Sequence, residues 1–162
     1  MTKATSTRLS EYKPYLFKIP SIEIWLDIQE TFVRVLSCLD VEPSTLDETP
    51  LVLKGVGLEL ESISINNEEL PSDCYEMGVE QLIIKHRSTA PFKLKIVSKI
   101  DPYSNTTLEG MYLSGNILTT QCEAEGFRRI IFHPDRPDVL SKFKVCIEAD
   151  RSRFPILLSN GN

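Results

Sequence analysis

Histidine is scarce in this sequence, and the short motifs that accompany catalysis are absent. The 162 residues include two histidines, His86 and His133. Neither belongs to an H-E-x-x-H motif, which puts two zinc-binding histidines on one helical face with a general-base glutamate between them. The G-x-S-x-G elbow and the G-x-x-x-x-G-K-[ST] loop are also missing. These absences predict no self-contained catalytic site and no metal bound by this chain.

Excess positive charge and long apolar runs are missing as well. The net charge of -5 argues against nucleic-acid binding and against binding to anionic membrane surfaces. No apolar run approaches the roughly 20 residues that span a bilayer. The polar opening residues lead into no apolar segment of a secretory signal. We therefore expect a cytoplasmic protein with no nucleic-acid partner and no membrane partner.

Cysteine is present but forms no recognisable motif. The four cysteines contain no C-x-x-C pair, which disfavours a zinc knuckle and a thioredoxin-like site. Their even number would permit disulfides in a secreted protein. Without a secretory signal, we predict reduced thiols that act mostly as small core residues. They are Cys38, Cys74, Cys122 and Cys146.

The apolar residues that are present recur mainly at every second position. We predict a flexible N-terminal arm over residues 1–13 and one β domain over residues 14–162. Alternation of this kind is typical of strands with one buried face, and a chain of this length can bury a core unaided. The pattern predicts an all-β fold, a sandwich or layered sheet. The expected strands are 22–29, 33–41, 81–85, 92–100, 111–113, 117–124, 127–132 and 143–148.

Several breaks in the pattern predict turns. The apolar phase changes between Leu60 and Ile63, which indicates a bulge, and residues 65–70 are typical of a turn between strands. A helical turn is expected over 136–140, with Asp135 as its cap. Residues 154–158 are strand-like, and the turn signal that follows has no partner strand. We therefore expect that the chain stops inside a larger domain.

Three segments together resemble a known family. They are NTTLEGMY at 105–112, TTQCEAEGFR at 119–128 and DRPDV at 135–139, followed by LLSNGN at 157–162. In this order and spacing they are similar to the N-terminal domain of aminopeptidase N, particularly the bacterial alanyl-aminopeptidase type. The likeness is strong from about residue 92 to the last residue and compatible before that. Several ordered segments are far more specific than one short motif.

The resemblance implies a fold and a larger enzyme. The family's first domain is a saddle-like β-sheet that packs on a thermolysin-like catalytic domain of the same polypeptide. That catalytic domain carries the zinc motif and a glycine-alanine-methionine-glutamate-asparagine motif, and neither occurs here. The resemblance thus implies the non-catalytic portion of a zinc aminopeptidase that releases N-terminal amino acids from peptides. The 162-residue chain alone is expected to be inactive.

The resemblance also implies substrate-binding residues. The family's Thr-Gln-Cys-Glu segment lines the substrate pocket beside the zinc, which carries that role to Gln121 and Glu123. On a strand these two side chains would share a face about 6.5–7 Å apart. A carboxylate can recognise the free α-ammonium of a peptide substrate N-terminus through a charge-assisted hydrogen bond, and the amide of Gln121 can donate and accept. Without the resemblance, an ordinary polar strand face is the simpler interpretation.

One alternative stays open, which is a free-standing β-sandwich binding or interaction module. An H-E-x-x-H motif encoded downstream would distinguish the two readings. We also expect possible self-association of this chain, because uncovered apolar surface and a free strand edge at 156–158 favour it.

Overall fold

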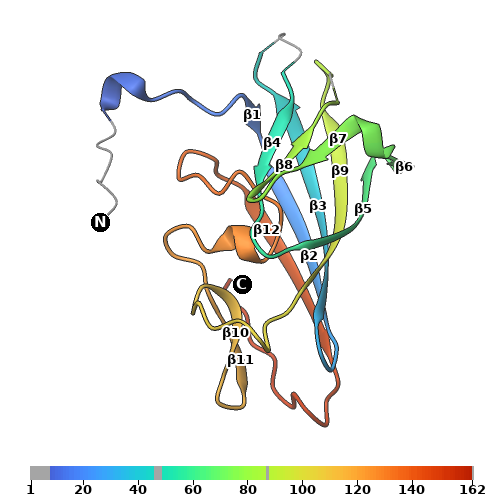
Figure 1. Cartoon of the computed structure of the whole chain (residues 1–162), viewed down its shortest axis with the longest axis vertical. Coiled ribbons are helices and arrows are strands. Elements are labelled where there is room, and N and C mark those ends of the chain that lie inside the picture. Colours follow the sequence, from blue (N-terminus) through green and yellow to red (C-terminus); the bar gives the residue numbers. More distant parts are fainter. Residues whose placement is uncertain (1–7, 46–48, 87, 162) are drawn as a thin grey trace.

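The computed structural model describes residues 8–45, 49–86 and 88–161, and its strands form three sheets (Figure 1). The main sheet has seven strands in the order β12-β2-β3-β9-β5-β6, with β1 paired to β3. A second sheet has the order β4-β8-β7, and β10 and β11 form a hairpin. The strands are β1 (Phe17–Lys18), β2 (Ser21–Ile28), β3 (Val33–Pro43), β4 (Leu51–Lys54), β5 (Glu59–Ile65), β6 (Glu68–Glu69), β7 (Tyr75–Met77), β8 (Gln81–Ile84), β9 (Phe92–Ile100), β10 (Gly110–Ser114), β11 (Ile117–Gln121) and β12 (Lys142–Ala149).

Helical structure in the described residues is limited to three short 3-10 turns. They are η1 (Leu9–Glu11), η2 (Ser72–Cys74) and η3 (Phe127–Arg129). The all-β prediction is confirmed. In the same described ranges, no helix has the length and apolar character needed to cross a membrane.

Alternating side chains build the centre of the main sheet, as predicted. In β2, every second residue from Ile22 to Ile28 is buried. β2 pairs antiparallel with β3, and β3 pairs antiparallel with β9 along its length. Because successive side chains of a strand point to opposite faces, these strands give the sheet one continuous apolar face.

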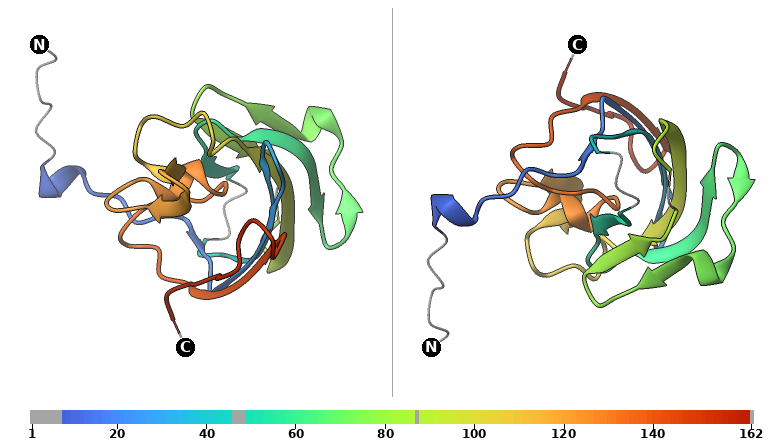
Figure 2. Two further views of the ribbon diagram at one scale, coloured as in Figure 1. Left: turned by 90° about the horizontal axis from the view of Figure 1, so that it is seen from below. Right: turned by 90° about the horizontal axis from the view of Figure 1, so that it is seen from above.

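The core lies between the main sheet and the segments that cover it. Seen end-on, the main sheet curves, and the β10–β11 hairpin and η3 lie on its concave side (Figure 2). Aliphatic residues of β4 and β8 join the same buried cluster, and so does the segment that follows η3. The largest fully buried side chains include Phe132, Ile22, Leu39, Leu53, Leu82 and Leu94.

Two predicted breaks in the pattern are confirmed. The pairing of β5 with β9 shifts register between Leu60 and Ser62, where the apolar phase changes. The turn after β5 contains Asn66 and Asn67, both with positive φ, and leads into β6. Asparagine tolerates this backbone region better than most residues, which explains the hairpin turn here.

Two predictions near residue 130 are wrong. The expected strand over 127–132 is instead η3 followed by a buried stretch, Ile130 to Phe132. Consecutive burial is incompatible with a half-buried strand, because a strand hides only alternate residues on one face. The segment 136–140, expected to be a helical turn, is not helical. It contains one β-turn, in which the Val139 N–H donates to the Arg136 carbonyl at 3.2 Å. Asp135 does not cap it, because its carboxylate accepts hydrogen bonds from Arg128.

The C-terminal part also differs from expectation. Residues 154–158 form no strand, so the predicted free edge does not lie there. β12 forms one edge of the main sheet, opposite the edge at β5 and β6, and pairs in parallel with β2. Of the four free cysteines, three are half-buried and Cys146 on β12 is exposed. The prediction of small core cysteines therefore holds only in part.

The predicted arm over 1–13 lies partly outside the described residues. Its described end contacts the loop after η3. The Tyr12 hydroxyl donates to Asp138 at 2.9 Å, and Arg136 Nη2 donates to the Lys13 carbonyl at 2.8 Å. The division into an arm and a domain stays a prediction.

Candidate functional site

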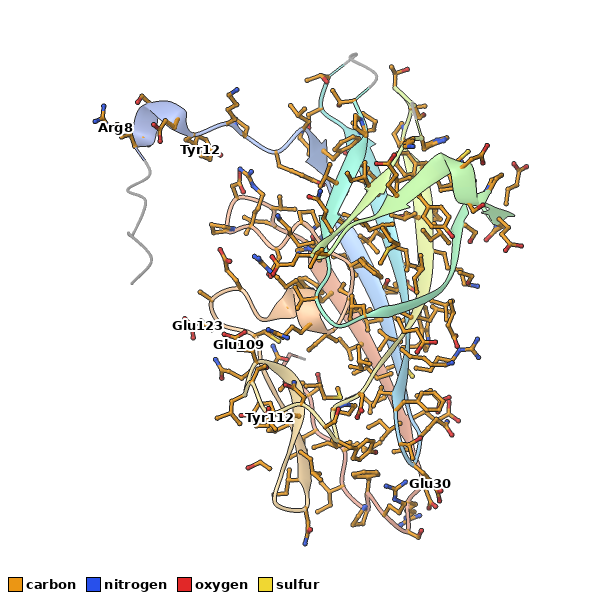
Figure 3. All side chains as sticks on the ribbon, viewed as in Figure 1. Arg8, Tyr12, Glu30, Glu109, Tyr112 and Glu123 are labelled. Carbon is orange, nitrogen blue, oxygen red and sulfur yellow. The ribbon has the colours of Figure 1, made fainter. Side chains whose placement is uncertain are left out.

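The two predicted site residues lie at the root of the β10–β11 hairpin. The hairpin is antiparallel from Gly110 opposite Gln121 to Ser114 opposite Ile117. Gln121 is therefore the last residue of β11, and its side chain is exposed. Glu123 follows in the loop 122–126 and is also exposed, on the outer side of the molecule away from the main sheet (Figure 3).

The predicted strand over 117–124 is too long, and this changes how the two residues are related. β11 ends at Gln121, so strand alternation does not extend to Glu123. A local hydrogen bond links them instead, because Gln121 Nε2 donates to the Glu123 carbonyl at 3.2 Å. The loop conformation thus determines where the Glu123 carboxylate lies.

Two glycines allow the hairpin root and the loop 122–126 to pack closely. The Gly126 N–H donates to the Cys122 carbonyl at 2.8 Å. A Cβ added at Gly126 would lie 2.6 Å from the Gln121 carbonyl oxygen. Gly110 has φ +73°, and a Cβ there would lie 2.5 Å from Arg129 Cβ. Any larger side chain at either position would force the backbone apart.

Most charged side chains around the hairpin root form ion pairs, whereas Glu123 forms none in the described part of the chain. Arg129 Nε lies 3.2 Å from Glu109 Oε2, and Arg128 pairs with both Asp135 and Glu125. No cation among the described residues lies within ion-pair distance of the Glu123 carboxylate. Glu123 is thus an exposed carboxylate that remains available for a positively charged ligand.

His133 is a packing residue beneath the site. It is 5% exposed, and its Nδ1 accepts a hydrogen bond from the Asp135 N–H at 2.9 Å. Its ring packs edge-on against Phe127 at 5.2 Å between centroids. Burial lowers the pKa of His133 to about 4, while the nearby Asp135 acts in the opposite direction. Within the described residues, Nε2 has no hydrogen-bond partner.

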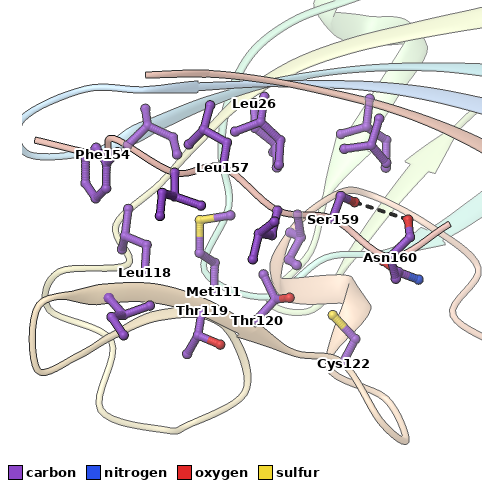
Figure 4. Close-up of a pocket in the computed structure, with 18 of the residues that line it drawn as sticks. Leu26, Met111, Leu118, Thr119, Thr120, Cys122, Phe154, Leu157, Ser159 and Asn160 are labelled. Atoms are coloured by element: carbon purple, nitrogen blue, oxygen red, sulfur yellow. Dashed lines mark hydrogen bonds between the residues drawn. The ribbon is translucent and has the colours of Figure 1, made fainter. Parts of the chain in front are cut away.

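A separate apolar hollow of about 920 Å³ lies between β2, the hairpin and the C-terminal residues (Figure 4). Its lining includes Leu26, Met111, Leu118, Phe154 and Leu157. Cys122 also borders it, and burial raises the pKa of that thiol. Gln121 and Glu123 are not part of the lining. The hollow offers apolar contact, whereas the polar chemistry lies on the other side of the hairpin root.

The described residues do not provide a metal centre. No group of three or more His, Cys, Asp or Glu side chains among them is arranged to hold a metal ion. The root of the hairpin can instead bind a cation through Glu123 and exchange hydrogen bonds through Gln121.

The comparisons with known proteins agree on one family. The family model of the peptidase M1 N-terminal domain matches residues 24–162. The aminopeptidase N of Caulobacter vibrioides is 45% identical over 157 residues, and that of Escherichia coli is 42% identical over 154 residues. These matches cover 97% and 94% of this chain, but the chain spans only 18% and 17% of those relatives.

Solved structures agree with this assignment. The structure of Legionella pneumophila aminopeptidase A in complex with aspartic acid matches with a TM-score of 0.86 and 32% identity, covering 96% of this chain and 18% of that one. An M1 zinc metallopeptidase from Deinococcus radiodurans bound to a Tyr-Ser-Ala substrate matches with a TM-score of 0.65. At 16% identity it shows a shared fold only.

Proposed function

Because the chain belongs to the peptidase M1 N-terminal domain family, we propose that it forms the non-catalytic N-terminal part of a zinc aminopeptidase and binds the substrate's free α-ammonium. One observation carries the proposal: Glu123 is an exposed carboxylate without a cationic partner among the described residues, and it lies next to Gln121. The proposed partners are a peptide substrate N-terminus and the catalytic domain of the same polypeptide. The proposed location is the cytoplasm.

The division of labour follows from the side chains. Three suitable metal ligands are not gathered anywhere in the described residues, so zinc does not fit this part of the chain and would be held by the catalytic domain. Zinc there would activate water and polarise the scissile carbonyl. This chain would contribute recognition. A carboxylate favours a charged α-ammonium over an acetylated or internal peptide nitrogen, which carries no charge.

The test uses a chimera in which this chain replaces the matching 18% of the Caulobacter vibrioides aminopeptidase N. Glu123→Ala removes a charge-assisted hydrogen bond, which contributes about 1.5–3 kcal/mol, so kcat/KM should fall about ten- to more than hundredfold. Gln121→Ala should cause a smaller loss, since a neutral amide makes a weaker contact. Zinc content should stay the same in both variants.

The matched control is Glu68→Ala, which removes an exposed carboxylate on β6 at the far edge of the main sheet. It should retain wild-type kinetics. N-acetylated substrates should be turned over poorly by every variant, with little further loss for Glu123→Ala. Wild-type efficiency of Glu123→Ala, or an equal loss on free and acetylated substrates, would contradict the proposal and favour a free-standing binding module.

A further inference from the structure

We infer that the ion pair between Arg128 and Asp135 is a positioning device for the loop 122–126, and through it for Glu123. This inference rests on the proposed function, because it assigns these two residues a role in the same site. Neither side chain is proposed to touch the substrate. Their effect would reach it only through the backbone that carries Glu123.

The pair is the most buried ion pair in the described part of the chain. The side chains of Arg128 and Asp135 are 17% and 8% exposed, whereas those of the next most buried pair, Lys99 and Glu61, are 32% and 21% exposed. Exposed pairs are screened by water, but a pair held this far inside the protein is screened much less. Loss of Arg128 would leave the buried Asp135 carboxylate uncompensated, and loss of Asp135 would leave Arg128 with only the exposed Glu125 as its ion-pair partner among the described residues.

Asp135 holds Arg128 at more than one point. Asp135 Oδ2 accepts from Arg128 Nε at 2.6 Å and from the Arg128 backbone N–H at 3.2 Å. The second contact fixes the backbone of η3 itself, directly after the loop. Arg128 Nη2 also lies 2.9 Å from Glu125 Oε2, which ties the same guanidinium to a residue inside the loop.

Asp135 is itself fixed to the core. It has φ +50°, and its N–H donates to the buried His133 ring. The backbone of His133 exchanges two hydrogen bonds with Lys54 at the end of β4. The ion pair therefore connects the end of β4, through His133, to a solvent-exposed loop.

The loop leaves little room for displacement. At Gly126, even one added carbon would lie 2.6 Å from the Gln121 oxygen and 3.0 Å from Cys122 Cα. A shift of η3 would therefore be transmitted directly to the hairpin root and to Glu123. Misplacement of a binding group by about 1 Å can cost about 100-fold in rate.

The first test is a double-mutant cycle in the chimeric enzyme with Asp135→Asn and Glu123→Ala. Asparagine keeps the size of aspartate and tolerates positive φ, so the substitution removes charge with little steric change. We expect Asp135→Asn to lower kcat/KM on free substrates about ten- to hundredfold, with little change on acetylated ones. The double variant should lose no more than Glu123→Ala alone, because both changes remove the same contact.

The control is Glu61→Gln, which breaks an Arg–carboxylate pair of the same length, 2.6 Å between Arg34 Nε and Glu61 Oε2, on the main sheet. It should leave the kinetics unchanged. Arg128→Lys keeps the positive charge but not the planar guanidinium. Its kcat/KM on free substrates should therefore lie between that of the wild type and that of Asp135→Asn.

A second measurement uses the 162-residue chain itself and does not depend on the chimera. Asp135→Asn should speed hydrogen exchange at the Gly126 amide, which bonds to Cys122, while the amides of the β2–β3 ladder keep their protection. Unchanged exchange at Gly126 would overturn the inference. So would equal losses on free and acetylated substrates, or losses that multiply in the double variant. Wild-type behaviour of Glu123→Ala would instead refute the proposed function.

Discussion

His133 should make the folded chain sensitive to mild acid. The perturbation is His133→Asn, which removes the titrating imidazole but keeps an oxygen that can accept the Asp135 N–H now bonded to Nδ1. The imidazole is 5% exposed, and its Nε2 lacks a partner within the described residues. A charge on this ring would be buried without full compensation, although Asp135 nearby would offset part of the cost.

The expected loss of folding stability in acid follows from the pKa of His133, which burial lowers to about 4. An unfolded histidine titrates near pH 6.5, so the unfolded state binds more protons at every pH between these two values. The contribution of neutral His133 to folding stability is therefore fully present above about pH 6.5 and is lost as the pH drops towards 4. The loss is about 2 kcal/mol between pH 7 and pH 5, out of the roughly 5–15 kcal/mol typical of a domain.

The assay is urea unfolding of the 162-residue chain at several pH values from 7.5 to 4.5. Carboxylates also titrate in this range, so the informative quantity is the difference between wild type and variant. That difference should change by about 1.2 kcal/mol per pH unit near pH 5.5, where the unfolded state binds about 0.9 proton more than the folded state. The cavity left by the smaller side chain lowers the free energy of unfolding by the same amount at every pH, so it does not alter the slope of that free energy against pH.

The control for this slope is Ile131→Val, which leaves a small cavity at a buried residue without a titrating group. It should lower the free energy of unfolding and keep the acid sensitivity of the wild type. Parallel pH profiles for wild type and His133→Asn would refute the reasoning, because they would mean that His133 protonates as easily in the folded chain as in the unfolded one.

Two further predictions concern the isolated chain. It should bind no stoichiometric zinc and cleave no aminoacyl-nitroanilide, since its described residues gather no metal-ligand set; one tightly held zinc, or turnover lost on chelation, would contradict this. It should also self-associate through β12, which has a free edge and half-exposed apolar side chains at Phe143 and Val145. Val145→Lys should shift light scattering towards the monomer, whereas a strictly monomeric wild type at high concentration would count against this surface.

Much of the main sheet could be predicted because its strands are half-buried along one face. β2, β3 and β9 show the period of two that such burial requires, and their predicted ranges agree with the structure to within two residues. The bulge near Leu60 could be predicted from the same alternation, because the apolar positions change from even to odd numbers between Leu60 and Ile63. Periodicity is informative wherever one face of a strand meets the core and the other meets solvent.

The region around η3 could not be predicted in this way. Ile130, Ile131 and Phe132 are buried from all sides, and a short apolar run of this kind does not distinguish a strand from another buried segment. Asp135 was misassigned because an aspartate before a proline-containing turn is typical of a cap. Its actual partner, Arg128, precedes it by seven residues and is brought close only by tertiary folding.

The candidate site shows the same division between what sequence and fold supply. The resemblance points to Gln121 and Glu123 as candidates, and their role stays a prediction, whereas strand alternation gives the wrong reason for their proximity. β11 ends at Gln121, and Glu123 depends on a loop held by close backbone contacts at Gly126 and by the charges of Arg128 and Asp135. A loop without its own hydrophobic core takes its geometry from such contacts. Substrate recognition by Glu123 would therefore be sensitive to residues that lie beneath it and never meet the substrate.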